Sequence, residues 1–203
     1  NPATRTELPI ASKTSMEMAL RRIGQQMNKE SDVLFLYMTS HGLPNVFEME
    51  NAPLDLAQVD PKWLRETLDA AGIRWRVIVI SSCYSGSFVP ALQNENTLVI
   101  TASAADRQSF GCSSEADYTY FGRAFFDQAM REQPSIEAAF EQTKETVAQW
   151  ESAQGFEPSE PQWSIGKNMQ LMLPQLEQRL FPPATAPQKL VSAPQKPAAA
   201  VLN

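Results

Sequence analysis

Histidine and cysteine are scarce in this chain of 203 residues, which has one histidine, His41, and two cysteines, Cys83 and Cys112. Structural zinc sites use four Cys or His ligands, so we expect no such metal site. Two cysteines allow at most one disulfide bond, which excludes a small fold held together by several disulfides. Any chemistry that needs a thiol and an imidazole therefore depends on these three side chains.

Long apolar runs and clusters of basic residues are also lacking. The longest strongly apolar stretch, from Val33 to Met38, is much shorter than the roughly 20 residues that a membrane-spanning helix needs. The formal net charge is −6 and the isoelectric point is about 4.9, whereas nucleic-acid binding usually requires a basic surface. We therefore expect no membrane span in this chain and no nucleic acid among its partners.

The two ends of the chain differ from its middle. The first residue is Asn1 and no apolar leader follows it, which favours a processed protein or an excised fragment. Residues 182–203 include five prolines and six alanines and lack aromatic side chains, so we predict a disordered tail there and a domain over residues 1–181. The compartment is not indicated: a soluble domain could be extracytoplasmic or attached to a membrane segment outside this chain.

Three apolar runs have the length of strands, namely Val33–Met38, Val77–Ile80 and Leu98–Ile100. Their apolar residues are continuous and do not alternate with polar ones, which is typical of strands buried on both faces. Such strands occur in parallel sheets that are covered by helices on each side. The runs therefore predict a mostly parallel, buried sheet.

Helix signals surround these strands. The segment Thr14–Glu17 has the pattern of a capping box before a helix that continues to about Met27. Asp60 and Pro61 suit a helix start, and Gly72 suits the position after its end. Three more elements are expected: a helix over 118–131, a helix that opens at Pro134-Ser135 and ends before Gly155, and a last strand over 164–173. Trp150 is placed on the apolar face of the second of these helices. Alternating helices and strands predict the α/β class.

The only histidine and one cysteine follow two of the predicted strands. His41 comes shortly after the first apolar run and Cys83 shortly after the second. Ligand sites in parallel sheets form beyond the carboxyl ends of the strands, and neighbouring strands lie roughly 5 Å apart. If the two strands are neighbours, the two side chains could serve one peptide carbonyl, with the thiolate attacking and the imidazole protonating the leaving amine. The backbone N–H groups of Gly42 and Cys83 could bind the oxyanion.

Other interpretations of these residues remain open. A free cysteine is often a small buried apolar residue, and a single histidine often has only a structural role. Cys112 lies in a loop and has no second histidine as a partner, so we assign it a structural role.

Several blocks, in order along the chain, resemble the legumain-type cysteine peptidases (peptidase family C13) of the caspase-like group, most closely the bacterial members. The resemblance spans about residues 12–173. The matching blocks are the strand ending in His41-Gly42, the strand ending in Cys83 with the pattern Cys-x-Ser-Gly-Ser, Thr101-Ala102, Ser109–Cys112, Thr119–Gly122 and Pro161–Gly166. The resemblance implies a caspase-like three-layer αβα sandwich, a catalytic dyad of His41 and Cys83, and an oxyanion hole at Gly42 and Cys83.

The chain also departs from that family. Only 32 residues precede Val33, so we expect this chain to lack the first strands of the family's fold. Tyr84 and Arg123 stand where legumains have acidic residues of the substrate pocket, to which the resemblance also assigns Ser109. A guanidinium at position 123 would favour an acidic residue before the scissile bond through a charge-assisted pair. A solvated helix residue is the alternative for Arg123.

The leading hypothesis for function is a cysteine endopeptidase that acts on peptides or proteins through a thioacyl intermediate. A transamidase or peptide ligase could use the same dyad, with an amine in place of water. A non-catalytic interaction module that keeps the fold is a third possibility. The dyad needs no metal and no organic cofactor, so none is expected. The sequence does not indicate an oligomeric state.

Overall fold

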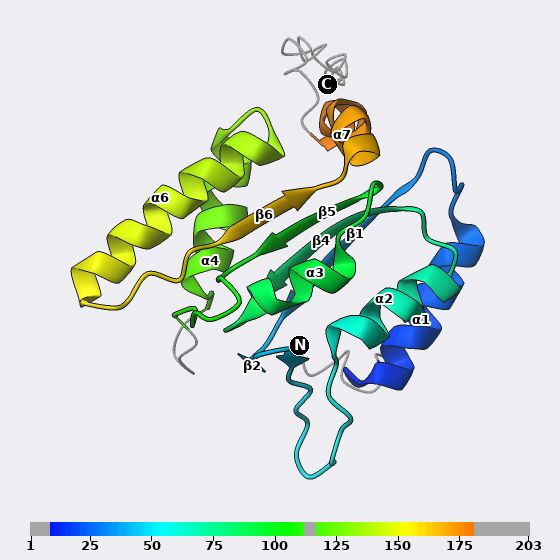
Figure 1. The fold of residues 1–203 in the computed structure, drawn as a ribbon, viewed down its shortest axis with the longest axis horizontal. Helices are drawn as coiled ribbons and strands as arrows, with labels where there is room; N and C mark the ends of the chain where they lie inside the picture. Colours follow the sequence, from blue (N-terminus) through cyan, green and yellow to red (C-terminus); the bar gives the residue numbers. More distant parts are fainter. Residues whose placement is uncertain (1–8, 112–116, 181–203) are drawn as a thin grey trace, which may run out of the picture.

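The computed structural model describes residues 9–111 and 117–180. Its centre is a four-stranded sheet in the order β1 (Val33–Thr39), β4 (Trp75–Ser81), β5 (Thr97–Thr101) and β6 (Gln162–Ile165) (Figure 1). The first three strands are parallel and β6 is antiparallel to β5. Helices cover both faces of the sheet, which confirms the predicted α/β sandwich. Within the described residues, no strand precedes β1, which forms one edge of the sheet.

Each face of the sheet has its own apolar core. Alternate residues of β4 point to opposite faces, so Ile78 packs in one core and Val77 in the other. The first core contains α1 (Lys13–Gln26), α2 (Pro61–Ala70) and α3 (Val89–Leu92). The second contains α4 (Tyr120–Gly122) with the helical segment that directly follows it, α6 (Ile136–Gln154) and α7 (Lys167–Leu180).

The three predicted strands are present, but β1 is buried differently from the other two. Every residue of β4 and β5 is buried. In β1, Phe35 is 37% exposed and Tyr37 is 40% exposed, so the prediction of burial on both faces was wrong for this strand. The reason is that β1 lies at the edge of the sheet. The ring of Phe126 packs against both exposed rings, and its centroid lies 4.7 Å from that of Tyr37.

The helix starts were predicted with mixed success. Asp60 caps α2 as expected, because its carboxylate accepts the N–H of Trp63, and Gly72 follows the helix with a φ of +69°. This hydrogen bond, helped by Lys13, holds the pKa of Asp60 below its usual value. The capping box at Thr14 was wrong, since the Ser12 hydroxyl caps α1 by accepting the N–H of Ser15.

Two predictions for the C-terminal half need correction. The helix expected over 118–131 consists of α4, a π-helical segment (Arg123–Ala129) and α5 (Met130–Glu132). The last strand is β6, and most of the segment 164–173 is helical instead, because α7 begins at Lys167. Met169 and Leu173 are the buried residues of α7, and their spacing of four is that of a helix face, not of a strand. The helix from Ser135 to Gly155 was predicted correctly as α6.

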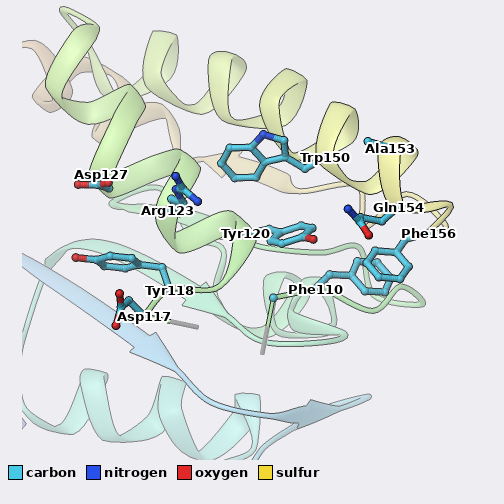
Figure 2. A pocket seen from close by; sticks show the side chains of 11 residues that line it. Phe110, Asp117, Tyr118, Tyr120, Arg123, Asp127, Trp150, Ala153, Gln154 and Phe156 are labelled. Carbon is cyan, nitrogen blue, oxygen red and sulfur yellow. The ribbon is translucent and has the colours of Figure 1, made fainter. Parts of the chain in front are cut away.

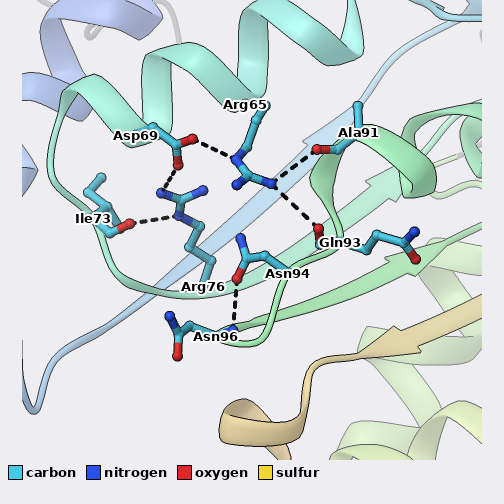
Figure 3. A network of polar contacts seen from close by, with 8 residues as sticks. All are labelled: Arg65, Asp69, Ile73, Arg76, Ala91, Gln93, Asn94 and Asn96. Atoms are coloured by element: carbon cyan, nitrogen blue, oxygen red, sulfur yellow. Dashed lines mark hydrogen bonds and ion pairs between the residues drawn. The ribbon is translucent and has the colours of Figure 1, made fainter.

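A polar network joins α2 to the helix that follows the Cys83 loop (Figure 3). The carboxylate of Asp69 accepts hydrogen bonds from Arg65 and from the buried Arg76 at the start of β4. Burial raises the pKa of Asp69, but the two guanidinium groups lower it more, so the pKa lies below its usual value. Arg65 also donates to the carbonyl oxygen of Ala91, over 3.3 Å, and so fixes α3.

No helix in residues 9–111 and 117–180 is both long enough and apolar enough to cross a membrane. The same residues contain no group of three or more His, Cys, Asp or Glu side chains that could hold a metal ion. Cys112, the predicted domain boundary at residue 181 and the predicted tail over 182–203 lie outside the described residues.

Candidate active site

The ends of β1 and β4 lie side by side. Thr39 pairs with Ser81 at the end of the parallel ladder, and the N–H of Ser40 donates to the carbonyl oxygen of Ser81 over 3.3 Å. His41 and Cys83 each follow their paired strand residue by two positions. The two strands are therefore neighbours, which is the condition on which the predicted site depends. His41 is exposed and Cys83 is half-buried.

A short hairpin follows His41 and fixes its backbone. It consists of β2 (Gly42–Leu43) and β3 (Val46–Phe47), and the N–H of Glu48 donates to the carbonyl oxygen of His41 over 3.0 Å. At the turn, the N–H of Asn45 donates to the Ser87 hydroxyl over 2.9 Å. Because Ser87 lies just after Cys83, this bond ties the histidine hairpin to the cysteine loop.

Gly42 allows these two segments to approach closely. A Cβ atom at this position would lie 2.6 Å from the carbonyl oxygen of Cys83 and 3.0 Å from the Ser82 hydroxyl oxygen. Contacts of 2.6 Å are shorter than any Cβ atom tolerates, so a larger residue would push the hairpin away from the cysteine loop. The glycine is therefore needed for the close packing of the two segments, while its predicted role as an oxyanion donor stays a prediction.

The chain turns sharply after Cys83. Tyr84 has a φ of +57°, and the short helix η2 (Ser85–Phe88) follows it. A bulky residue in the left-handed region is uncommon, and strained backbone of this kind is concentrated at functional sites. The N–H of Tyr84 donates to the carbonyl oxygen of Arg107 over 2.8 Å, which holds the turn in place.

The thiol of Cys83 lies against the backbone of Ser109. Its sulfur is 3.3 Å from the carbonyl oxygen of Ser109 and 3.4 Å from the N–H nitrogen of the same residue. The carbonyl can accept the S–H of a thiol, and the N–H can donate to a thiolate, so one residue serves both protonation states. This contact could not be predicted from the sequence, because it joins residues 26 positions apart and no local pattern indicates it.

Tyr84 and Arg123 line two different cavities. Tyr84 borders one of about 440 Å³, and Arg123 borders a larger one of about 810 Å³ (Figure 2). Phe110 and Phe156 line both cavities, and their rings stack with centroids 4.3 Å apart. The structure thus brings Ser109 to Cys83 but separates Tyr84 from Arg123. A single substrate pocket formed by Tyr84, Ser109 and Arg123 stays a prediction.

The larger cavity is lined by aromatic rings together with one cation, Arg123, and two carboxylates, Asp117 and Asp127. The guanidinium of Arg123 lies over the ring of Trp150, 5.6 Å from its centroid, and Tyr120 packs edge-on against the same ring. Arg123 and Asp127 extend from the π-helical segment toward this cavity (Figure 2). Asp127 pairs with Arg131 over 3.2 Å. No carboxylate of the described residues lies within ion-pair distance of Arg123.

Sequence reasoning missed most of these aromatic residues. Trp150 was assigned only to the apolar face of α6, and the stack of Phe110 on Phe156 was not foreseen. The only signal in the sequence was weak: Phe110 and Phe156 each adjoin a glycine. In the structure these glycines, Gly111 and Gly155, have positive φ, which is typical of turns and helix ends.

A comparison with family models matches residues 17–172 to the "Peptidase C13 family". The chain belongs to the peptidase C13 family. The matched range includes all six predicted site residues, which are His41, Gly42, Cys83, Tyr84, Ser109 and Arg123. The family resemblance inferred from the sequence is therefore confirmed, while the similarity to bacterial members stays a prediction.

Two relatives match a shorter segment of the chain. The chain is 35% identical to legumain from Canavalia ensiformis over 82 residues, which make up 39% of this chain and 17% of that protein. It is 34% identical to a vacuolar-processing enzyme from Ricinus communis over 86 residues, 41% of this chain and 17% of that protein. The matched segment is therefore a minor part of each relative's length.

The fold resembles that of a caspase. Caspase-1 from Spodoptera frugiperda superimposes with a TM-score of 0.57 at 14% sequence identity, covering 78% of this chain and 69% of that one. This similarity concerns the fold alone, and it confirms the caspase-like sandwich predicted from the sequence.

Proposed function

We propose that this protein is a cysteine endopeptidase in which Cys83 is the nucleophile and His41 is the acid and base. The observation that carries the proposal is the pairing of Thr39 with Ser81, because it aligns the ends of β1 and β4 at one edge of the sheet. Membership of the peptidase C13 family supports the same chemistry. The substrates are peptides or proteins.

The proposed reaction has two stages. The thiolate of Cys83 attacks the peptide carbonyl carbon, a C–S bond forms, and the N–H groups of Gly42 and Cys83 stabilise the oxyanion. The imidazolium of His41 then donates a proton to the amine as the C–N bond breaks. Water attacks the thioester while His41 takes its proton, and the acid product leaves as the C–S bond breaks. In the free enzyme, the N–H of Ser109 stabilises the thiolate by donating a hydrogen bond to the sulfur.

We also propose that the Arg123 cavity receives an acidic side chain from the residue before the scissile bond. Stacking on Trp150 restrains the guanidinium plane, and its N–H donors can then bind a carboxylate in a bidentate manner. The cavity lies near the nucleophile in space, because its lining residue Phe110 directly follows Ser109, whose backbone contacts the Cys83 sulfur. Tyr84 would contact a different part of the substrate, from the neighbouring cavity.

The proposed hydrolysis can be tested by isotope labelling. A peptide panel that varies the residue before the scissile bond is incubated with the protein in H₂¹⁸O, with a second peptide present as an amine nucleophile. Hydrolysis places ¹⁸O in the new carboxyl terminus, as mass spectrometry detects. Joined peptides without ¹⁸O would instead identify a transamidase or ligase. If no peptide in the panel changes covalently, the enzymatic proposal fails in favour of a non-catalytic interaction module.

A further inference from the structure

A fully buried serine lies behind the cysteine loop. Ser103 follows β5, and its hydroxyl donates to the carbonyl oxygen of Ser82 over 3.1 Å. The same hydroxyl oxygen accepts the N–H of Ser85 over 3.1 Å and lies 3.2 Å from the Ser85 hydroxyl. Since the hydrogen of Ser103 is used on Ser82, the hydroxyl of Ser85 is the donor in the last contact. Ser103 thus contacts the residues on both sides of the Cys83–Tyr84 pair.

One of these bonds acts on a specific peptide unit. The carbonyl of Ser82 and the N–H of Cys83 belong to the same planar peptide group, so they point in opposite directions. A hydrogen bond that fixes this carbonyl also fixes the direction of the Cys83 N–H. It further polarises the group, because hydrogen bonds in a chain strengthen one another. The Cys83 N–H is one of the two proposed oxyanion donors.

Ser103 is itself held firmly. Its N–H donates to the Ser85 hydroxyl over 3.1 Å, and its carbonyl oxygen accepts the Thr101 hydroxyl over 2.9 Å. A Cβ atom at Gly86 would lie 2.8 Å from the Ser103 carbonyl oxygen and 2.6 Å from the N–H nitrogen of Ala105. The loop after β5 therefore packs directly on the cysteine loop and has little room to move.

We propose that Ser103 is a positioning residue, which orients the Cys83 N–H toward the oxyanion of the transition state. This inference rests on the proposed peptidase function. Loss of the hydroxyl should weaken the oxyanion interaction while the thiol stays reactive, because alkylation of sulfur forms no oxyanion. Removal of a whole oxyanion donor typically lowers kcat about 10²–10³-fold, so misdirecting one donor should lower kcat by about 10- to 100-fold.

The test compares Ser103→Ala with Thr143→Ala, which removes another fully buried hydroxyl, within α6. In Ser103→Ala, we expect kcat for peptide cleavage to fall about 10- to 100-fold, with KM and the iodoacetamide alkylation rate of Cys83 unchanged. Thr143→Ala should leave kcat and the alkylation rate unchanged. Equal losses in cleavage and alkylation, or an unchanged kcat, would overturn the positioning role.

A second variant covers the case in which Ser103→Ala does not fold. Ser103→Cys keeps nearly the same side-chain shape but offers only a weak donor, so the same fall in kcat is expected. Circular dichroism and the melting temperature report on folding in each variant. If the wild-type protein itself cleaves no peptide, the proposed function has failed, which is a different outcome from failure of the Ser103 proposal.

Discussion

Replacing Cys83 with alanine should lower kcat/KM for peptide cleavage by at least about 10⁴-fold, because the variant has no atom that can form the thioester. The fold should persist, since the Ser109 backbone is the sulfur's only hydrogen-bond partner among residues 9–111 and 117–180, and alanine fits the same space. Steady-state kinetics on the best peptide of the panel measure the loss, and the melting temperature checks the fold.

The matched control for this variant is Cys112→Ser, which removes the other thiol of the chain. We expect it to retain kcat/KM within about threefold of wild type, since most substitutions away from a site have small effects. Retained activity in Cys83→Ala would show that Cys83 is not the nucleophile. Loss of activity in Cys112→Ser alone would move the assignment to Cys112.

Reversing the charge at Arg123 should change which peptides are cleaved. Wild type is expected to cleave after Asp faster than after Asn or Lys, because the guanidinium can pair with a carboxylate in the cavity. In Arg123→Glu, kcat/KM for the Asp peptide should fall about 10²-fold, which corresponds to the typical strength of a hydrogen bond to a charged group. For the Asn peptide the change should stay within about threefold, because no charge pair is lost.

The control for this charge reversal is Arg21→Glu, an exposed position in α1 that pairs only with Glu17 among the described residues. It should leave the preference for Asp over Asn unchanged, since surface ion pairs of this kind contribute little. Equal losses on the Asp and Asn peptides in Arg123→Glu would contradict the proposed pocket. Faster wild-type cleavage after Lys or Arg than after Asp would do so as well.

The sequence was sufficient to propose the site residues that lie directly after the ends of strands. The apolar runs that lead to His41 and Cys83 are local signals, and the ends of neighbouring parallel strands meet at one edge. The burial of β1 could not be predicted in the same way, because an edge strand and a central strand can have the same composition. In α7, Met169 and Leu173 have the helical spacing that the prediction of a strand overlooked.

The surroundings of the two site residues depend on contacts between distant parts of the chain. Ser109 meets the Cys83 sulfur and Ser103 meets the Ser82 carbonyl only once β4 and β5 are paired. Likewise, the ring of Trp150 reaches Arg123 only when α6 packs on the π-helical segment. The sequence alone selected Cys83 and Arg123 as candidate functional residues. The residues that contact them could be identified only from the fold.

The most direct test of the central claim is site-resolved labelling with a peptidyl acyloxymethyl ketone, which reacts with a catalytic thiol held beside its general acid. Mass spectrometry of the digested protein locates the thioether formed. The label is expected on Cys83 and not on Cys112, and at a rate at least about 10²-fold lower in His41→Ala, the typical contribution of general acid–base catalysis. Labelling at Cys112, or equal rates with and without the imidazole, would contradict the assignment of Cys83 and His41 as the catalytic pair.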